Sequence, residues 1–303
     1  MPVTAGVALS PQFPYEEIEK AWLDAEDLAL ESAWVYDHFM GIPDTSKPYL
    51  EGWTLLTTLL MKSKRIRGGN LVLGNSYRHP AVLANMAATL DIVSGGRLDV
   101  GIGAGWYEAE YNAYGIPFPK INVRMEALDE ALQVMKGLWT QERTNFSGNH
   151  YTIADSPFEP KPLQKPHPPV WVGGEGEKYL LKIAGRWADG WNVWLLPIED
   201  YRRKAGVLAG YAEAAGRDPA SIRRSVGIAL ALAPTEEGVR AILASREGKR
   251  EARAVVAGTP EQVVEHLRPY VEAGAQTILV EGLAPLDPEM MTLFMKEVVP
   301  ALG

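Results

Sequence analysis

Two features of this chain could do chemistry, and each follows a predicted strand. His38 comes after the apolar segment 33–36, and its imidazole can accept or donate a proton near neutral pH. The glycine-rich segment 101–105 offers bare backbone that a ligand can approach closely, and the aromatic Trp106 follows it. Together they predict proton transfer beside a flat, partly apolar ligand. The plainer interpretations are a loop histidine held by Asp37 and an ordinary tight turn.

A third candidate is the sequence GGEGE at 173–177, between a predicted strand and a predicted helix. Free backbone N–H groups at such a turn can bind a phosphate. The two glutamates argue against a highly charged anion, so a single phosphate group is the expectation. An ordinary strand-to-helix turn remains the alternative.

The glycines at 101–105 do not predict a Rossmann dinucleotide site. That motif requires the glycine turn to open directly into a helix whose N-terminus holds the pyrophosphate. We expect no helix here until about Val123. The predicted purpose of these glycines is therefore close approach of the backbone to a ligand.

Acidic and aromatic side chains near the strand ends have more than one interpretation. Glu108 and Glu110 could act as acid or base, but helix capping or a salt bridge with Arg124 explains them equally well. Most tryptophans only pack, yet Trp106 and Trp194 both follow predicted strands and are expected to line a pocket.

The sequence does not predict a metal site. None of the five histidines has a second histidine four residues away, and there are no cysteines to serve as ligands. The lack of cysteine also excludes disulfides and thiol catalysis, and a reducing cytoplasm is the expected compartment.

Composition limits the class of protein. The 303 residues are 47% hydrophobic and 22% charged, which is typical of a soluble globular protein. The net charge of −8 argues against nucleic acid or an anionic membrane as a partner. No segment is apolar over the length of a membrane span, and the first residues do not form a secretory signal.

Hydrophobic patterning predicts strands alternating with helices along the chain. The expected strands are 3–9, 33–36, 70–73, 98–102, 170–172, 190–194, 222–232 and 276–280. The expected helices are 16–30, 53–61, 80–93, 123–139, 178–187, 198–215, 260–273 and 288–299. The proline-rich segment 140–169 breaks the rhythm and predicts irregular chain with a small hairpin.

This alternation predicts one α/β domain over residues 1–303, a (β/α)8 TIM-like barrel with insertion segments. Strands that alternate with helices pair in parallel, and their continuous apolar runs indicate burial on both faces. In such a barrel the functional residues lie at the carboxyl ends of the strands. His38, Trp106 and the GGEGE turn all fall at predicted carboxyl ends.

Seven motifs in the chain resemble the luciferase-like flavin and deazaflavin superfamily, most of all its branch that uses coenzyme F420. They are VYDH (35–38), NLVLGNSYRHP (70–80), LDIVSGGRLDVGIGAGW (90–106), EYNAYGIPF (110–118), PFEPKPLQKPHPPVWVGG (157–174), AGRWADGWN (184–192) and GTPEQV (258–263). No single motif would suffice, but together they are specific.

The resemblance implies roles that spacing alone does not show. It implies a cis peptide between Leu71 and Val72 behind the cofactor ring, and barrel insertions in 140–169 and around 241–257. The polar edge of the ring would meet Asp37 and His38. The resemblance further implies cofactor contacts at Leu71, Val72, Asn75, Ala104, Gly105, Gly173, Gly174, Gly176 and Glu177.

The chain departs from the pattern in one place. Some deazaflavin dehydrogenases of this family carry a glutamate acid/base directly after the position of Gly105, where this chain has Trp106. Basic residues for a substrate phosphate are also missing after the sixth strand, in NVWLLP at 192–197. These differences disfavour sugar phosphates and favour a more apolar substrate.

The resulting prediction is hydride transfer between coenzyme F420 and a small organic substrate. His38 would exchange the accompanying proton, and Trp53, Trp106 and Trp194 would surround the substrate. A reduced-FMN-dependent monooxygenase of the same superfamily is the first alternative. A non-redox isomerase using His38 and Glu110, a non-catalytic flavin-binding protein, and a homodimeric state also stay open.

Overall fold

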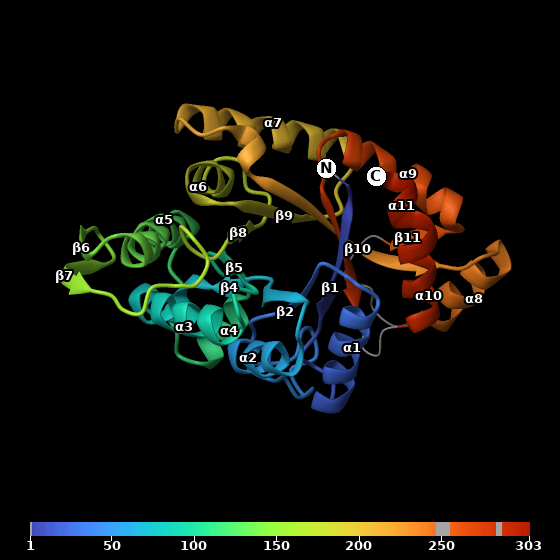
Figure 1. The fold of residues 1–303 in the computed structure, drawn as a ribbon, viewed down its shortest axis with the longest axis horizontal. Helices are drawn as coiled ribbons and strands as arrows, with labels where there is room; N and C mark the ends of the chain where they lie inside the picture. The colour runs from blue at the N-terminus through green and yellow to red at the C-terminus, as the bar shows by residue number, and fades with distance from the viewer. Residues whose placement is uncertain (1, 247–254, 283–286) are drawn as a thin grey trace.

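The central feature of the fold is a closed barrel of eight parallel strands (Figure 1). The computed structural model describes residues 2–246, 255–282 and 287–303. The barrel strands are β1 (Thr4–Leu9), β2 (Ser32–Val35), β3 (Arg67–Asn70), β5 (Leu98–Gly103), β8 (Val170–Gly173), β9 (Gly190–Trp194), β10 (Arg223–Leu232) and β12 (Thr277–Gly282).

Every neighbouring pair of barrel strands is parallel, and the ring closes where β1 meets β12. In that pairing Val7 lies opposite Val280, and both side chains are buried. All strands therefore direct their carboxyl ends to the same mouth of the barrel. The predicted TIM-like barrel is confirmed.

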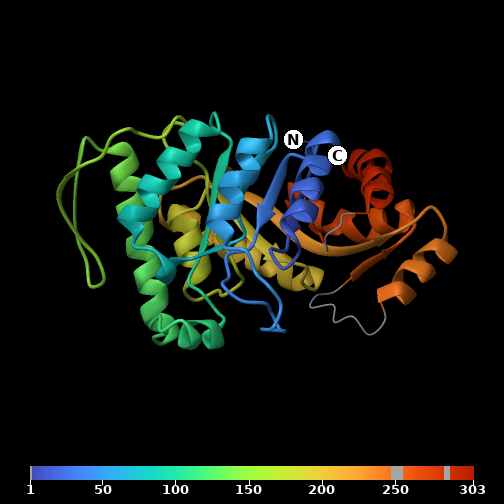
Figure 2. The ribbon, with the colours of Figure 1, turned by 90° about the horizontal axis from the view of Figure 1, so that it is seen from below.

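Helices surround the barrel, as the alternating pattern requires (Figures 1 and 2). They are α1 (Tyr15–Asp27), α2 (Gly52–Lys62), α3 (Pro80–Val93), α5 (Ile121–Thr140), α6 (Leu180–Trp187), α7 (Ile198–Ala214), α9 (Pro260–Glu272), α10 (Pro288–Leu293) and α11 (Val299–Leu302). A π-helical turn at Phe294–Val298 joins α10 to α11, and the two chain termini lie close together.

The irregular segment contains the expected hairpin, formed by β6 (Arg143–Ser147) and β7 (Thr152–Pro157). The hairpin projects from the barrel beside α5 (Figures 1 and 2). A second addition consists of α8 (Glu236–Arg246) and β11 (Val255–Gly258), which extends the sheet beyond β10. The sequence did not predict α8 or β11, and the insertion expected around 241–257 lies partly outside the described residues.

One expectation about the site region is wrong. The short helix α4 (Glu108–Ala113) begins two residues after Trp106, where no helix was expected before Val123. Its six residues make fewer than two helical turns, so periodicity did not identify it. The Rossmann interpretation still fails, because β5 is a strand of a closed barrel.

The third strand is interrupted where the resemblance placed a cis peptide. The bond between Leu71 and Val72 is cis, as predicted, and it separates β3 from the two-residue strand β4 (Leu73–Gly74). The chain then forms a single 3-10 turn at Asn75–Tyr77 before α3.

Large side chains and ion pairs fill the barrel interior below the mouth. Trp34 and Trp171 meet edge to face, with ring centroids 5.7 Å apart. At the amino end of the strands, Arg67 pairs with Asp99 at 2.9 Å and Arg223 with Glu31 at 2.8 Å. Access to the barrel is therefore from the carboxyl end. Among the described helices, none has the length and apolar character to cross a membrane.

Candidate active site

The central pair of the site is His38 and Glu110. Nδ1 of His38 lies 2.9 Å from a carboxylate oxygen of Glu110, and the Glu110 side chain is fully buried. An ionised carboxylate can only accept, so Nδ1 carries the proton and donates it. This leaves Nε2 as the ring nitrogen that can exchange a proton with a bound molecule. The His38 side chain is 16% exposed, so it can be reached from the mouth.

Glu110 is held by four donors from two segments of the chain, residues 38–40 and Tyr77. Besides His38, it accepts hydrogen bonds from the backbone N–H groups of Phe39, at 2.6 Å, and Met40, at 3.3 Å, and from the hydroxyl of Tyr77. Burial alone would raise the pKa of Glu110, but the hydrogen bonds from His38, Tyr77 and Phe39 outweigh it and lower the pKa. Glu110 is therefore an anion that orients the imidazole.

Three aromatic rings stand edge-on around His38 and form an aromatic collar. The imidazole lies 6.0 Å from the ring of Tyr49, 5.8 Å from Trp106 and 6.3 Å from Tyr107, at interplanar angles of 88°, 88° and 84°. Burial, followed by the charges of Asp37 and Glu110, raises the pKa of the Tyr49 hydroxyl, so it stays neutral. The rings around His38 thus form an apolar surface, and the nearby carboxylates make the electrostatic potential there negative.

Asp37 is a structural anchor in this arrangement. Its carboxylate forms a two-pronged ion pair with Arg78, at 2.8 and 2.9 Å, and accepts the N–H of Gly74 at 3.0 Å. Arg78 also bonds Glu51, which caps the first turn of α2. These contacts fix the ends of β2 and β4 beside the cis peptide. The predicted contact of Asp37 with a cofactor stays a prediction.

Val72, which follows the cis peptide bond, lies against two glycines. A methyl group added at Gly103 or Gly173 would lie 2.8 Å or 2.7 Å from the side chain of Val72. Leu71 is buried with Trp34 and Trp171 in the barrel interior. A side chain at either glycine would therefore displace Val72, so these two positions of β5 and β8 require glycine.

Asn75 carries a buried polar atom that lacks a partner. Its amide nitrogen donates to the hydroxyl of Tyr151 at 3.3 Å, whereas its Oδ1 has no partner among the described residues. An unpaired buried oxygen is unfavourable unless a bound molecule satisfies it. Asn75 was predicted to contact the cofactor, and this oxygen is consistent with that role.

The backbone at Ala104 and Gly105 is held in place by the side chain of Arg124. Nη1 of Arg124 donates to the carbonyls of both residues, and its guanidinium lies 3.8 Å from the ring centroid of Phe118. Gly105 has φ of +77°, and any side chain there would collide with the hydroxyl of Tyr111. The salt bridge considered between Arg124 and Glu110 is wrong, because Glu110 bonds His38 instead.

The turn after β8 has an unusual backbone and balanced charges. Gly174 has φ of +129°, and its N–H bonds the carbonyl of Asn192 at 3.0 Å. Glu177 pairs with Arg203 and, at 3.3 Å, with Lys204. Because these cations offset the glutamates, the turn is compatible with one phosphate. The predicted cofactor roles of Gly173, Gly174, Gly176 and Glu177 remain predictions.

The three tryptophans predicted for the substrate pocket lie in different surroundings. Trp106 is 65% exposed at the mouth, against the ring of Tyr107. Trp194 is half-buried and packs on Tyr36 at 6.4 Å, next to the barrel interior. Trp53 is only 7% exposed and belongs to the main hydrophobic core. The structure therefore brings Trp106 to the side of His38, and the substrate-pocket roles of all three tryptophans stay predictions.

Four residues of the site were not singled out from the sequence. Tyr77 holds Glu110, and Arg78 holds Asp37. Tyr49 and Tyr107 flank His38. Tyr77 and Arg78 belong to the NSYRHP motif at 75–80, and this motif was the only indication in the sequence that they belong to the site.

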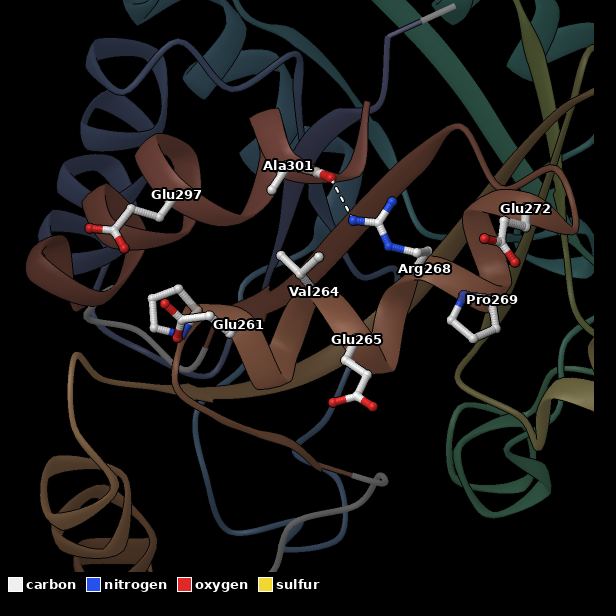
Figure 3. A pocket seen from close by; sticks show the side chains of 9 residues that line it. Glu261, Val264, Glu265, Arg268, Pro269, Glu272, Glu297 and Ala301 are labelled. Atoms are coloured by element: carbon white, nitrogen blue, oxygen red, sulfur yellow. Dashed lines mark hydrogen bonds between the residues drawn. The ribbon is translucent and has the colours of Figure 1, made fainter.

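Two other features lie apart from this site. The groove between α9 and the carboxyl-terminal helices has four glutamates in its lining, but Glu265 and Glu297 point away from each other (Figure 3). Glu126, Glu130 and His150 could meet a metal ion, yet both oxygens of Glu130 accept backbone N–H groups of the β6–β7 hairpin. Glu130 therefore serves to fasten the hairpin to α5.

Comparisons with known proteins agree with this architecture. The chain is 27% identical to an F420-dependent glucose-6-phosphate dehydrogenase of Amycolatopsis mediterranei (strain U-32), over 97% of each chain. It is 29% identical to an FMNH(2)-dependent dimethylsulfone monooxygenase of Pseudomonas putida, over 68% of this chain and 55% of the relative. Among solved structures, an F420-dependent secondary alcohol dehydrogenase bound to an F420-acetone adduct covers both chains fully, with a TM-score of 0.85 and 21% identity.

The profile of one protein family matches residues 2–250, which is most of the chain. That match agrees with the closed parallel barrel, with the cis bond at Leu71–Val72 and with a site built at the strand ends. The chain belongs to the luciferase-like monooxygenase family.

Proposed function

We propose that this protein is an F420-dependent oxidoreductase that transfers a hydride between the deazaflavin and a small organic substrate. The observation that carries the proposal is the His38–Glu110 pair at the mouth of the barrel, whose nitrogen and oxygen lie 2.9 Å apart. A relative that matches 97% of this chain, from Amycolatopsis mediterranei (strain U-32), is named for the same cofactor. We propose no metal.

The residues at the strand ends fit a flat polar ring with a phosphate-bearing chain. Leu71, Val72, Ala104 and Gly105 would hold the ring, and Oδ1 of Asn75, which has no partner among the described residues, would accept a hydrogen bond from it. The turn at Gly173–Gly174 would hold the phosphate region. When bound, coenzyme F420 accepts or donates a hydride at C5 and does not form the oxygen adducts of flavins.

The protein's own contribution is to position the substrate and to move one proton. In the oxidising direction Nε2 of His38 would take the hydroxyl proton of an alcohol whose hydride the bound cofactor would accept, so a carbonyl product would remain. In the reducing direction protonated His38 would donate its proton to the carbonyl oxygen. Glu110 stabilises the imidazolium in either direction, because its carboxylate accepts from Nδ1.

The substrate that the site suits best is neutral and partly apolar. His38 is enclosed by Tyr49, Trp106 and Tyr107, and Trp106 exposes a large ring surface at the mouth. Of the nearby arginines, Arg78 is bound to Asp37 and Glu51, and Arg124 to two backbone carbonyls. Both arginines are therefore occupied by these contacts, and neither is available to a substrate phosphate. We therefore propose alcohols, ketones or aldehydes rather than sugar phosphates.

Turnover with F420 tests this proposal. Purified protein is mixed with F420 and a panel of neutral secondary alcohols, and with reduced F420 and the matching ketones, while the visible absorbance of the cofactor is followed. Glucose 6-phosphate serves as the anionic comparison. We expect turnover with at least one neutral substrate class and a far lower kcat/KM with glucose 6-phosphate.

Two results would contradict the proposal in different ways. Oxygen-dependent product formation with reduced FMN, and none with F420, would establish the monooxygenase alternative. Efficient use of glucose 6-phosphate with F420 would keep the cofactor and overturn the substrate class. A cytoplasmic location remains the accompanying expectation, based on the absence of cysteine in the chain.

A further inference from the structure

The loop of the β6–β7 hairpin is fixed to the barrel by Glu130 of α5 (Figures 1 and 2). The Glu130 carboxylate accepts the backbone N–H groups of Asn149, His150 and Tyr151, at 2.7, 2.9 and 3.1 Å. Glu130 is itself only 7% exposed. Three backbone donors on one buried carboxylate hold the loop in a single conformation, so the side chain of Tyr151 starts from a fixed position.

Tyr151 reaches from this loop to the strand ends of the barrel. Its ring packs against the main hydrophobic core, and its hydroxyl accepts a hydrogen bond from Nδ2 of Asn75 at 3.3 Å. The two residues are 76 positions apart in the sequence, and Asn75 comes directly after β4. One hydrogen bond therefore joins the hairpin, which is an insertion in the barrel, to a residue of the candidate active site.

This hydrogen bond orients the amide group of Asn75. An amide side chain carries a donor nitrogen and an acceptor oxygen on opposite branches. Because Tyr151 binds Nδ2, Oδ1 lies on the branch away from the Tyr151 hydroxyl, and Oδ1 has no partner among the described residues. Asn75 is only 2% exposed, so leaving this oxygen unpaired is unfavourable. Oδ1 can only accept, so a molecule that satisfies it must offer an N–H or O–H group.

We propose that Tyr151 is a positioning residue for the cofactor: its hydroxyl holds the Asn75 amide so that Oδ1 accepts an N–H group of the ring. This inference rests on the proposed function, because it requires a ring bound at the strand ends. The rings of F420 and FMN both carry an N–H group in their pyrimidine part, so the same role applies to either cofactor. The β6–β7 hairpin then contributes to cofactor binding without touching the cofactor.

Equilibrium binding of F420, followed by cofactor fluorescence, tests this role without any substrate. Tyr151→Phe keeps the ring that packs on the core and removes only the hydroxyl. We expect its dissociation constant to rise roughly 3-fold to 10-fold, the effect of one hydrogen bond. Asn75→Ala should weaken binding by at least the same factor. Tyr211→Phe is the control and should bind like wild type, because it changes another half-buried tyrosine of the core, on the outer helix α7.

The double variant N75A/Y151F separates positioning through Asn75 from a general effect on the fold. If Tyr151 acts only by orienting Asn75, its hydroxyl has no further effect once the amide is gone. The double variant should then bind F420 as Asn75→Ala does, within roughly twofold. If Tyr151 only supports the hairpin, the losses of the two single variants should multiply in the double variant.

The possible failures of this inference and of the proposed function are distinguishable. Unchanged F420 affinity in Tyr151→Phe, or multiplied losses in the double variant, would overturn the role of Tyr151 and leave the proposed function intact. If wild type binds FMN and not F420, the proposed function fails, and the same variants titrated with FMN decide the role of Tyr151. A wild type that binds neither cofactor would overturn both.

Discussion

Glu110 accepts a hydrogen bond from Nδ1 of His38 across 72 residues of sequence, and this contact orients the imidazole that faces the mouth of the barrel. His38 follows β2, whereas Glu110 belongs to the short helix after β5. The pair forms because β2 and β5 flank β3, so their carboxyl ends open onto the same site.

Removal of the imidazole should abolish most of the turnover. His38→Ala is expected to lower kcat by roughly 100-fold to 10,000-fold, the usual contribution of a positioned acid or base. Steady-state F420 turnover with the best neutral substrate measures the loss, and added imidazole should restore part of it. His79→Ala is the control, because His79 is exposed and caps α3. An unchanged kcat in His38→Ala would remove His38 from the chemistry.

Neutralising Glu110 should lower stability in a pH-dependent way. Glu110→Gln loses hydrogen bonds to a charged acceptor, at a cost of about 1–3 kcal/mol. The folded pKa of Glu110 lies below its ordinary value of 4.5, so the carboxylate's contribution is complete above pH 4.5 and is lost as pH falls below it. Urea unfolding of both proteins from pH 3 to 7 measures this. A gap between them that does not narrow in acid would show that Glu110 titrates normally in the fold.

Loss of Arg78 should be one of the most destabilising changes near the site. Arg78→Met leaves the buried carboxylate of Asp37 without its cation, at an expected cost of about 3–5 kcal/mol. Combining it with Asp37→Asn should recover part of the loss, since the unpaired charge is then gone. Arg143→Met is the control, because that pair with Asp155 is exposed and contributes less than about 1 kcal/mol. Equal costs for Arg78→Met and Arg143→Met, measured by denaturant unfolding, would contradict the account.

Alanine substitution at two glycines measures how closely the backbone next to Trp106 packs against Tyr111. Gly105 and Gly115 have similar positive φ angles, +77° and +66°, but only Gly105 faces another group, the hydroxyl of Tyr111. Gly115→Ala should cost about 1 kcal/mol through backbone conformation alone. Gly105→Ala should cost clearly more and also reduce turnover, because it displaces the backbone next to Trp106. Equal losses in thermal unfolding would show that the site tolerates that displacement.

Much of the framework could be predicted because it depends on local patterns. Buried strands and amphipathic helices repeat along the chain, and helix α3 and strand β9 match their predicted boundaries. The cis bond at Leu71–Val72 was predicted only through the family resemblance, since nothing in the side chains themselves requires it.

The parts that could not be predicted depend on long-range contacts. In the sequence, Glu110 had equally good partners in Arg124 and in a helix end, and only the fold decides among them. Trp53 and Trp106 were equivalent pocket candidates in the sequence, and only the fold shows that Trp53 is buried in the core while Trp106 is exposed. Helix α4 is too short to show periodicity, so its role in delivering Glu110 was not visible.

The most direct test of the central claim is an equilibrium titration of the purified protein with F420 and with FMN, each in its oxidised and reduced form. Binding is followed by cofactor fluorescence or absorbance, and it needs no knowledge of the substrate. The account predicts saturable binding of F420 at micromolar concentration and at least tenfold weaker binding of either form of FMN. Tight binding of reduced FMN with negligible binding of F420 would contradict it.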